Sequence, residues 1–121
     1  MTGEISLSTK HGIEKIAWVR EMVSDEYGVM LAACDIELLD KKLRFGEVEI
    51  CISKKFYGEK LVNEEELKFM LETADVLNLV GEKVIKLAED LGLISPEAKV
   101  FFEDSDGKKI PHAQMYRFMV T

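Results

Sequence analysis

The alternation of apolar and polar residues predicts five strands in this chain of 121 residues. Successive side chains of a strand point to opposite faces, so a half-buried strand alternates with a period of two. The clearest case is EVEICIS at 47–53, where Val48, Ile50 and Ile52 share one face. The other predicted strands, in chain order, are 15–24, 29–35, 99–103 and 109–118. The turns DEYG and DSDG join the first and last pairs, which predicts two β-hairpins.

Between residues 63 and 91 the apolar spacing becomes that of an amphipathic helix. Asn63 followed by Glu66 is a capping-box pattern, which marks a helix start. Gly92 is a good C-terminal stop. The stripe fits one helix of about 28 residues, or two helices broken at Gly81. Its positions are Leu67, Met70, Leu71, Ala74, Leu77, Asn78, Gly81, Ile85, Ala88 and Leu91, of which Leu71 and Ala74 are expected to be buried.

These elements predict an α+β fold, with a single-domain antiparallel sheet and a long or broken helix packed on one face. The domain is expected to span residues 15–121, and residues 1–14 form a loosely defined N-terminal arm. Asp35 ends the second strand and is a plausible N-cap for the short segment that follows it.

Composition indicates a globular intracellular protein. Hydrophobic residues make up 47% of the chain, enough to bury a core. No apolar run approaches a membrane span, and no N-terminal segment has the order of a signal peptide. We therefore expect a cytoplasmic protein with no membrane partner. Cys34 and Cys51 have no close-spaced cysteine, which favours buried, reduced thiols.

Charge is unevenly distributed along the chain. The net charge is −7, which disfavours generic binding of nucleic acid. Residues 41–60 nevertheless carry six bases and three acids, whereas residues 63–91 carry eight acids and three lysines. The domain is therefore expected to have a basic part and an acidic part.

Basic residues lie beside aromatic ones in KKLRF and KKFY, and GKK adds a third basic pair. This composition is typical of surfaces that bind single-stranded RNA. The alternative is that the lysines are simply solvated and that Phe45, Phe56 and Tyr57 fold inward. The candidate RNA-binding residues are Lys41, Lys42, Arg44, Lys54, Lys55, Lys108 and Lys109.

The segment PHAQ is the strongest candidate site. Pro111 cannot donate to a sheet ladder, so we expect an edge or a bend there. His112 and Gln114 should share one face of the strand. His112 could act as a base, a metal ligand or a hydrogen-bond donor to a partner, or it could only donate to a nearby backbone carbonyl.

Asn78 and FYG could complete a concave patch with that polar face. As a buried amide, Asn78 needs a partner, either in a neighbouring element or in a ligand pocket. Asp35 could belong to the same site or cap a helix, and nothing adjacent to Cys34 would lower the pKa of its thiol. The candidate ligand-binding residues are Pro111, His112, Gln114, Asn78, Phe56, Tyr57, Gly58 and Asp35.

The motifs AACDIELLDKKL, FYGEKLV, NLVGEKVIKLA, GLI and PHAQ occur in an order that resembles a small archaeal family known as domain of unknown function 424. The resemblance runs from about Ala32 to Gln114. The family usually has glycine where this chain has Asp40, and often where it has Glu59. The resemblance implies an archaeal, cytoplasmic protein and supplies no reaction.

The sequence contains no glycine-rich phosphate loop, no HExxH and no CxxC. We therefore predict a small non-catalytic binding module, without cofactor or catalytic residues, whose partner is a protein. The alternatives are an RNA- or ribosome-associated protein and a small metal-dependent hydrolase. The latter would need His112 to join Asp35 or Asp104 from distant parts of the sequence.

Overall fold

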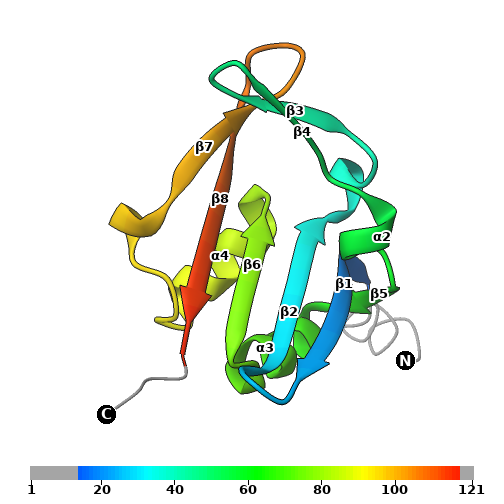
Figure 1. Cartoon of the computed structure of the whole chain (residues 1–121), viewed down its shortest axis with the longest axis vertical. Helices are drawn as coiled ribbons and strands as arrows, with labels where there is room; N and C mark the ends of the chain where they lie inside the picture. The colour runs from blue at the N-terminus through cyan, green and yellow to red at the C-terminus, as the bar shows by residue number, and fades with distance from the viewer. Residues whose placement is uncertain (1–13, 118–121) are drawn as a thin grey trace, which may run out of the picture.

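The predicted hairpins are both present in the computed structural model, which describes residues 14–117. Each predicted strand matches an observed one to within a few residues, and three further strands complete an eight-stranded sheet. The order across the sheet is β4-β3-β7-β8-β6-β2-β1-β5 (Figure 1). The strands are β1 (Lys15–Ser24), β2 (Gly28–Asp35), β3 (Lys42–Phe45), β4 (Val48–Cys51), β5 (Lys60–Asn63), β6 (Val76–Val80), β7 (Val100–Glu103) and β8 (Lys109–Tyr116).

The sheet is mixed, so the prediction of a wholly antiparallel sheet was wrong. β2 and β6 pair in parallel, with Ala32 opposite Asn78, whereas the other pairs are antiparallel. Both strands lie at the centre of the sheet and bury most of their residues on two faces. Near-continuous apolar runs are characteristic of such doubly covered strands.

The predicted helix over 63–91 is two short helices with a strand between them. α3 spans Glu64–Thr73, and α4 spans Glu82–Asp90 after the glycine at position 81. The capping box is confirmed, since Asn63 Oδ1 accepts from Glu66 N at 2.8 Å and Glu66 Oε1 accepts from Asn63 N at 2.9 Å. Neither a continuous helix nor a single break at Gly81 is correct. The segment VLNLV is buried on both faces, and periodicity alone does not separate such a strand from a buried helix turn.

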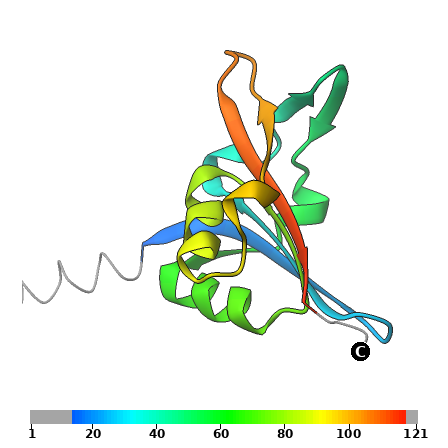
Figure 2. The same cartoon turned by 90° about the vertical axis from the view of Figure 1, so that its left-hand side faces the viewer.

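The two faces of the sheet are covered by different elements (Figure 2). α3 and α4 pack on one face, over a core that contains Leu71 and Ala74, both buried as predicted. On the other face, α2 (Lys54–Tyr57) and the β3–β4 hairpin border a second core that contains Ala32 and Cys34. We call this second side the concave face.

The segment after Asp35 differs from its prediction. A 3-10 turn at Ile36–Leu38 leads into β3, and a second one lies at Pro96–Ala98. Asp35 makes no side-chain capping bond to the turn that follows it. Asp40 has a φ of 68°, a conformation that glycine adopts without strain, which gives a physical reason for the glycine usual in the similar family.

The cysteines differ from their prediction in one respect. Both cysteines are free, but Cys51 is exposed and not buried as expected. Within residues 14–117, every helix is too short or too polar to cross a membrane. The N-terminal arm predicted over 1–14 lies outside the described residues, except for residue 14.

Candidate functional site

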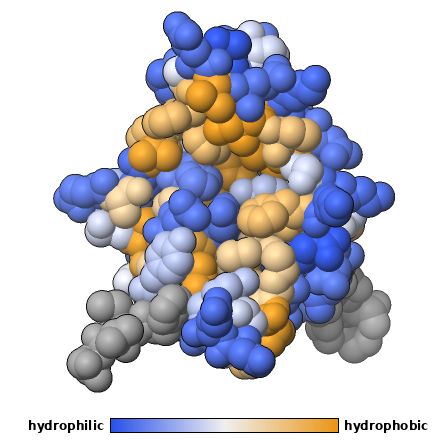
Figure 3. Space-filling view, viewed as in Figure 1, coloured by the Kyte–Doolittle hydropathy of each residue, from blue (hydrophilic) through white to orange (hydrophobic). Residues whose placement is uncertain are grey.

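Strand register places the main candidate residues on the concave face. Asn78 on β6 lies opposite Gln114 on β8, and Val80 lies opposite His112. Paired residues share a face, so Asn78, His112 and Gln114 all project from the side opposite α3 and α4. Figure 3 shows that apolar side chains gather in a hollow at the middle of this face, bordered by hydrophilic ones.

Tyr57 joins this group from α2. The helix is capped by Ser53, whose hydroxyl accepts from Phe56 N at 3.1 Å. The Tyr57 hydroxyl then donates to Asn78 Oδ1 at 2.8 Å, and the Phe56 ring packs edge-on against Tyr57 at 4.9 Å. Two segments 21 residues apart in sequence therefore meet over the central strands.

His112 stacks on Phe102 of β7. The ring centroids are 4.8 Å apart, with an interplanar angle of 21°. Burial lowers the pKa of the half-buried imidazole. Within residues 14–117, no group hydrogen bonds to the imidazole, so the alternative in which His112 pins a nearby carbonyl has no support among those residues.

Cys34 and Tyr57 are not poised for nucleophilic or acid–base chemistry. Burial raises the pKa of the Cys34 thiol to about 12, and the neighbouring charge of Asp35 adds to the effect. Burial also raises the pKa of the Tyr57 hydroxyl. Both groups remain protonated at neutral pH, which suits packing and hydrogen bonding.

Pro111 is separated from the concave group. It is buried and borders a depression beside α4, on the opposite side of β8 from His112. Of the two expectations for Pro111, an edge or a bend, the edge was wrong, because β8 lies between β7 and β6. The Pro111 carbonyl accepts from Gly81 N at 2.9 Å. The missing N–H therefore points toward the end of β6, where the ladder stops at Val80, so the sheet loses little by having proline there.

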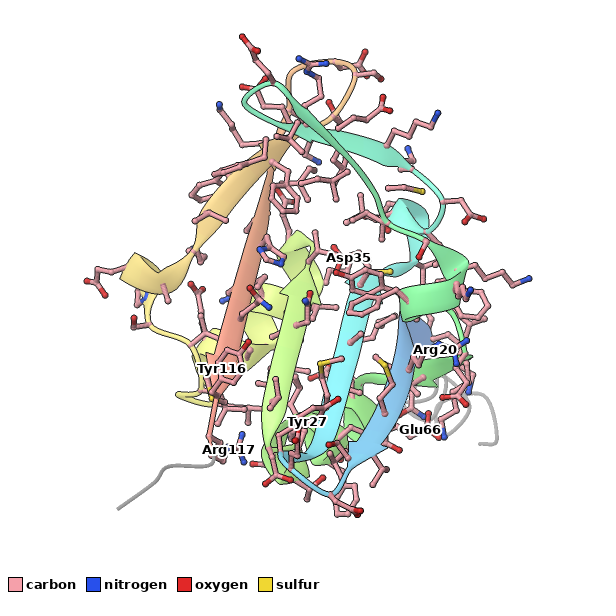
Figure 4. All side chains as sticks on the ribbon, viewed as in Figure 1. Arg20, Tyr27, Asp35, Glu66, Tyr116 and Arg117 are labelled. Carbon is pink, nitrogen blue, oxygen red and sulfur yellow. The ribbon has the colours of Figure 1, made fainter. Side chains whose placement is uncertain are left out.

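Asp35 is also outside the concave group and acts as a remote cap of α4. Its Oδ1 accepts from Val84 N at 2.9 Å, and its Oδ2 accepts from Lys83 N at 3.0 Å. Figure 4 shows Asp35 at the end of β2, beside the end of β6. Burial raises the pKa of this carboxyl, against the opposing effect of the two N–H donors. The capping interpretation was therefore correct in kind, although the helix is not the one predicted.

The described residues do not support the hypothesis of a metal site. Among residues 14–117, no three His, Cys, Asp or Glu side chains gather closely enough to hold an ion. Asp35 and His112 project from opposite faces of the sheet. Asp104 accepts from Asp106 N and Lys108 N, each at 2.9 Å, in the β7–β8 turn.

The basic segments are linked through two aspartates. Asp40 Oδ1 accepts from Lys54 N at 3.3 Å, which ties α2 to the loop before β3. The hydrogen bond from the Lys108 N–H is the main cause that lowers the pKa of Asp104, and the charge of Lys41 lowers this pKa as well. One depression is lined by Asp40, Lys41, Lys42, Asp104, Ser105 and Asp106.

Two of the candidate lysines form ion pairs with glutamates. Lys108 Nζ lies 3.8 Å from Glu82 Oε1, and Lys109 Nζ lies 2.5 Å from Glu103 Oε2. Of the aromatics, Tyr57 is buried, Phe56 is partly buried and Phe45 is exposed. The inward-folding alternative therefore holds for Tyr57 but not for Phe45.

Sequence reasoning missed two residues of the concave face. Phe102 supports His112, and only the pairing of β7 with β8 reveals it. Arg20 lies opposite Ala32, in the same row as Asn78, and its Nε is buried with no hydrogen-bond partner within the described part of the chain. The alternation within β1 indicates that Arg20 and Val19 point to opposite faces of the sheet. It does not indicate that Arg20 lies in the same row as Asn78.

Comparison with known proteins gives family and fold. A crystal structure of an uncharacterized conserved protein from Methanopyrus kandleri is 24% identical, with a TM-score of 0.65, and the match covers 87% of this chain and 94% of that one. No curated protein matches the chain. The model of a family described as protein of unknown function DUF424 matches residues 22–118. The chain therefore belongs to the DUF424 family.

Proposed function

We propose that this chain is a small binding module and that its concave face holds the ligand. The observation that carries the proposal is the bond from Tyr57 to Asn78, in a row that also contains Gln114. It joins aromatic and amide groups from distant segments beside the half-buried imidazole of His112. Such a mixture of apolar surface and a few polar groups is typical of ligand sites.

A non-catalytic role fits the chemistry of these groups. The Cys34 thiol and the Tyr57 hydroxyl are held protonated by burial. The Asp35 carboxyl is engaged by two helix N–H groups on the opposite face. Amides and aromatic rings remain, and these groups recognise a ligand by hydrogen bonding and stacking.

A site-specific photocrosslinker tests the proposal. Benzoylphenylalanine is placed at the exposed position Gln114 and, in a control protein, at Lys86 on α4, whose side chain is 75% exposed on the opposite side. Irradiation in a native cell extract should give a discrete adduct from position 114 and none from position 86. Digestion of the adduct with ribonuclease or protease then distinguishes RNA from protein. Equal or absent crosslinking at the two positions would exclude the concave face as the binding surface.

RNA is the second candidate ligand, and charge separation favours it. The acidic helices α3 and α4 cover one face, whereas α2 and the basic β3 border the other (Figures 1 and 2). A strand of RNA approaching the concave face would meet Lys54 and Lys55 while avoiding the acidic helices. A protein partner is the other class that the crosslinking experiment can reveal.

A further inference from the structure

The half-buried imidazole of His112 has one face covered by Phe102. Val100 lies opposite His112 and Phe102 lies opposite Ile110, so Phe102 is the diagonal neighbour of His112 on the β7 side. On the β6 side, Val80 lies opposite His112, and Asn78 is the diagonal neighbour in the reverse direction. Because Phe102 stacks on the imidazole from the β7 side, the opposite ring face lies on the β6 side, where Asn78 is the diagonal neighbour.

A hydrogen bond fixes the orientation of the Asn78 side-chain amide. Its Oδ1 accepts the Tyr57 hydroxyl, so the two hydrogens of Nδ2 are left to donate elsewhere. Gln114 lies directly opposite on β8 and is exposed. Two carboxamides on neighbouring strands have Cβ atoms about 4.5–5.5 Å apart. Both carboxamides can therefore reach the same small ligand on this face.

The surroundings of this space are apolar and aromatic. Ala32 and Val80 flank Asn78 and His112 on this face and are fully buried in the second core. Tyr57 stands on one side and the His112–Phe102 stack on the other. The hydrophobic middle of the concave face is visible in Figure 3.

We propose that the slot between His112 and Tyr57 binds one nucleobase, which stacks on the imidazole face opposite Phe102 and accepts hydrogen bonds from Asn78 and Gln114. Stacking on an aromatic side chain together with hydrogen bonds to the base edge is how proteins recognise unpaired bases. The inference rests on the proposed function, because it requires the concave face to be the binding surface. The base can belong to a free nucleotide or to an unpaired position in an RNA strand.

The alternative ligand is a peptide, whose amides could also bond to Asn78 and Gln114. The stacked pair favours the base, since a flat ring gains from a parallel aromatic platform whereas an extended peptide does not. Arg20 lies in the same row of the sheet, and Lys54 and Lys55 lie on the bordering helix. These cations favour a ligand that carries phosphate.

Titration with nucleobase ligands tests the inference. The full chain is titrated with the four nucleoside monophosphates and with single-stranded oligonucleotides of each base, while the side-chain amide signals of Asn78 and Gln114 are followed by NMR. We expect saturable shifts of both signals with at least one base. Binding by free nucleotides and oligonucleotides shows that a single nucleotide suffices. Binding by oligonucleotides alone shows that the strand is the source.

Conservative variants separate recognition from folding. Asn78→Asp keeps the acceptor for the Tyr57 hydroxyl but removes the two hydrogens that Asn78 donates. It should therefore weaken binding at least about tenfold, while the temperature of thermal unfolding stays that of the wild type. His112→Phe should keep the stacking platform and most of the affinity, whereas His112→Ala should lose at least about tenfold. Lys86→Ala on α4 is the control and should bind as the wild type does.

The outcomes distinguish this inference from the proposed function. If no base shifts either amide at millimolar concentration, but position 114 crosslinks to a protein, the nucleobase inference is overturned and the binding module stands. If bases bind with equal affinity to wild type and His112→Ala, the slot is not the site. If neither bases nor crosslinks involve the concave face, both proposals are overturned.

Discussion

The carboxyl group of Asp35 occupies the space that a side chain at position 81 would need. A Cβ built on Gly81 would lie 2.4 Å from Asp35 Cγ, and the Gly81 φ of 117° is itself disfavoured for other residues. A matching pair lies at the other end of the same parallel strands. A Cβ on Gly28 would lie 2.1 Å from Asp75 Oδ2, which accepts from Val29 N at 2.9 Å. β2 and β6 are therefore tied at both ends by an aspartate facing a glycine.

Gly81→Ala should be severely destabilising. The new methyl group would displace the Asp35 carboxylate from the α4 N-terminus, in addition to the backbone strain. We expect a loss of at least about 3 kcal/mol in the free energy of unfolding, measured by urea titration. Gly92→Ala is the matched control, since Gly92 has a φ of 77° with no atom within 4 Å of a Cβ. It should cost only about 1–2 kcal/mol, and equal losses would mean that Asp35 imposes no steric limit.

Asp35→Ala should leave two N–H groups of α4 without acceptors. The expected cost is about 1–3 kcal/mol for the unpaired buried groups, measured by urea titration. Asp35→Asn should lie between the wild type and Asp35→Ala, because one oxygen still accepts while the amide N–H₂ faces a donor. Glu37→Ala, at an exposed position nearby, should remain within about 0.5 kcal/mol of wild type. A neutral effect of Asp35→Ala would contradict the capping role.

Local patterns predicted what depends on local chemistry. The capping box at Asn63, the two hairpins and the shared face of His112 and Gln114 follow from residue type and period. The strand VLNLV did not, because a strand buried on both faces has the same apolar density as a helix. The parallel pairing of β2 with β6 is a long-range relationship that no local pattern encodes.

The candidate site was predictable only in part, for the same reason. PHAQ, FYG and Asn78 could be proposed as neighbours, and Tyr57 does reach Asn78. Pro111 was included as part of PHAQ, and Asp35 as a carboxylate at the end of a buried strand. Adjacent residues of a strand point to opposite faces, so Pro111 projects away from His112. Arg20 enters the row of Asn78 only through the parallel pairing of β2 with β6, which the sequence does not reveal, and Phe102 lies beside His112 only through the register of the β7–β8 hairpin.

Leu71→Ala should destabilise the fold by about 2–5 kcal/mol, the usual cost of removing a large buried side chain. Leu71 is fully buried between α3 and the sheet. Phe69→Ala, on the same helix, is the control because Phe69 is 68% exposed. It should cost less than about 1 kcal/mol. A urea titration in which Leu71→Ala also loses less than about 1 kcal/mol would contradict the observed helix register.

His112 should make stability depend on pH. Burial lowers the pKa of the folded imidazole below its value in the unfolded chain, about 6.5. Between the two pKa values the unfolded state binds more protons, so stability rises with pH across that window. The contribution is complete above about pH 6.5 and is lost as pH falls through the folded pKa. His112→Phe should remove this part of the pH dependence of unfolding, and an unchanged profile would show that His112 does not titrate with folding.

Any affinity for RNA should depend on the candidate lysines. Replacing Lys41, Lys42, Lys54, Lys55, Lys108 and Lys109 with alanine should abolish retention on single-stranded RNA and flatten its dependence on salt. Lys108 and Lys109 already pair with Glu82 and Glu103, so most of the effect should come from the other four.

A smaller matched pair of variants separates a local surface from net charge. The triple variant Lys41→Ala, Lys54→Ala, Lys55→Ala removes three charges from α2 and the loop before β3, and Lys68→Ala, Lys83→Ala, Lys86→Ala removes three from α3 and α4. Only the first should reduce the slope of log affinity against log salt, by roughly 0.7 for each phosphate that the variant no longer neutralises. An equal reduction in the two variants would mean that RNA senses net charge alone. If the wild-type protein is not retained on single-stranded RNA at low salt, an RNA strand is excluded as the ligand. A basic surface binds a polyanion most strongly under those conditions, because the charges are least screened.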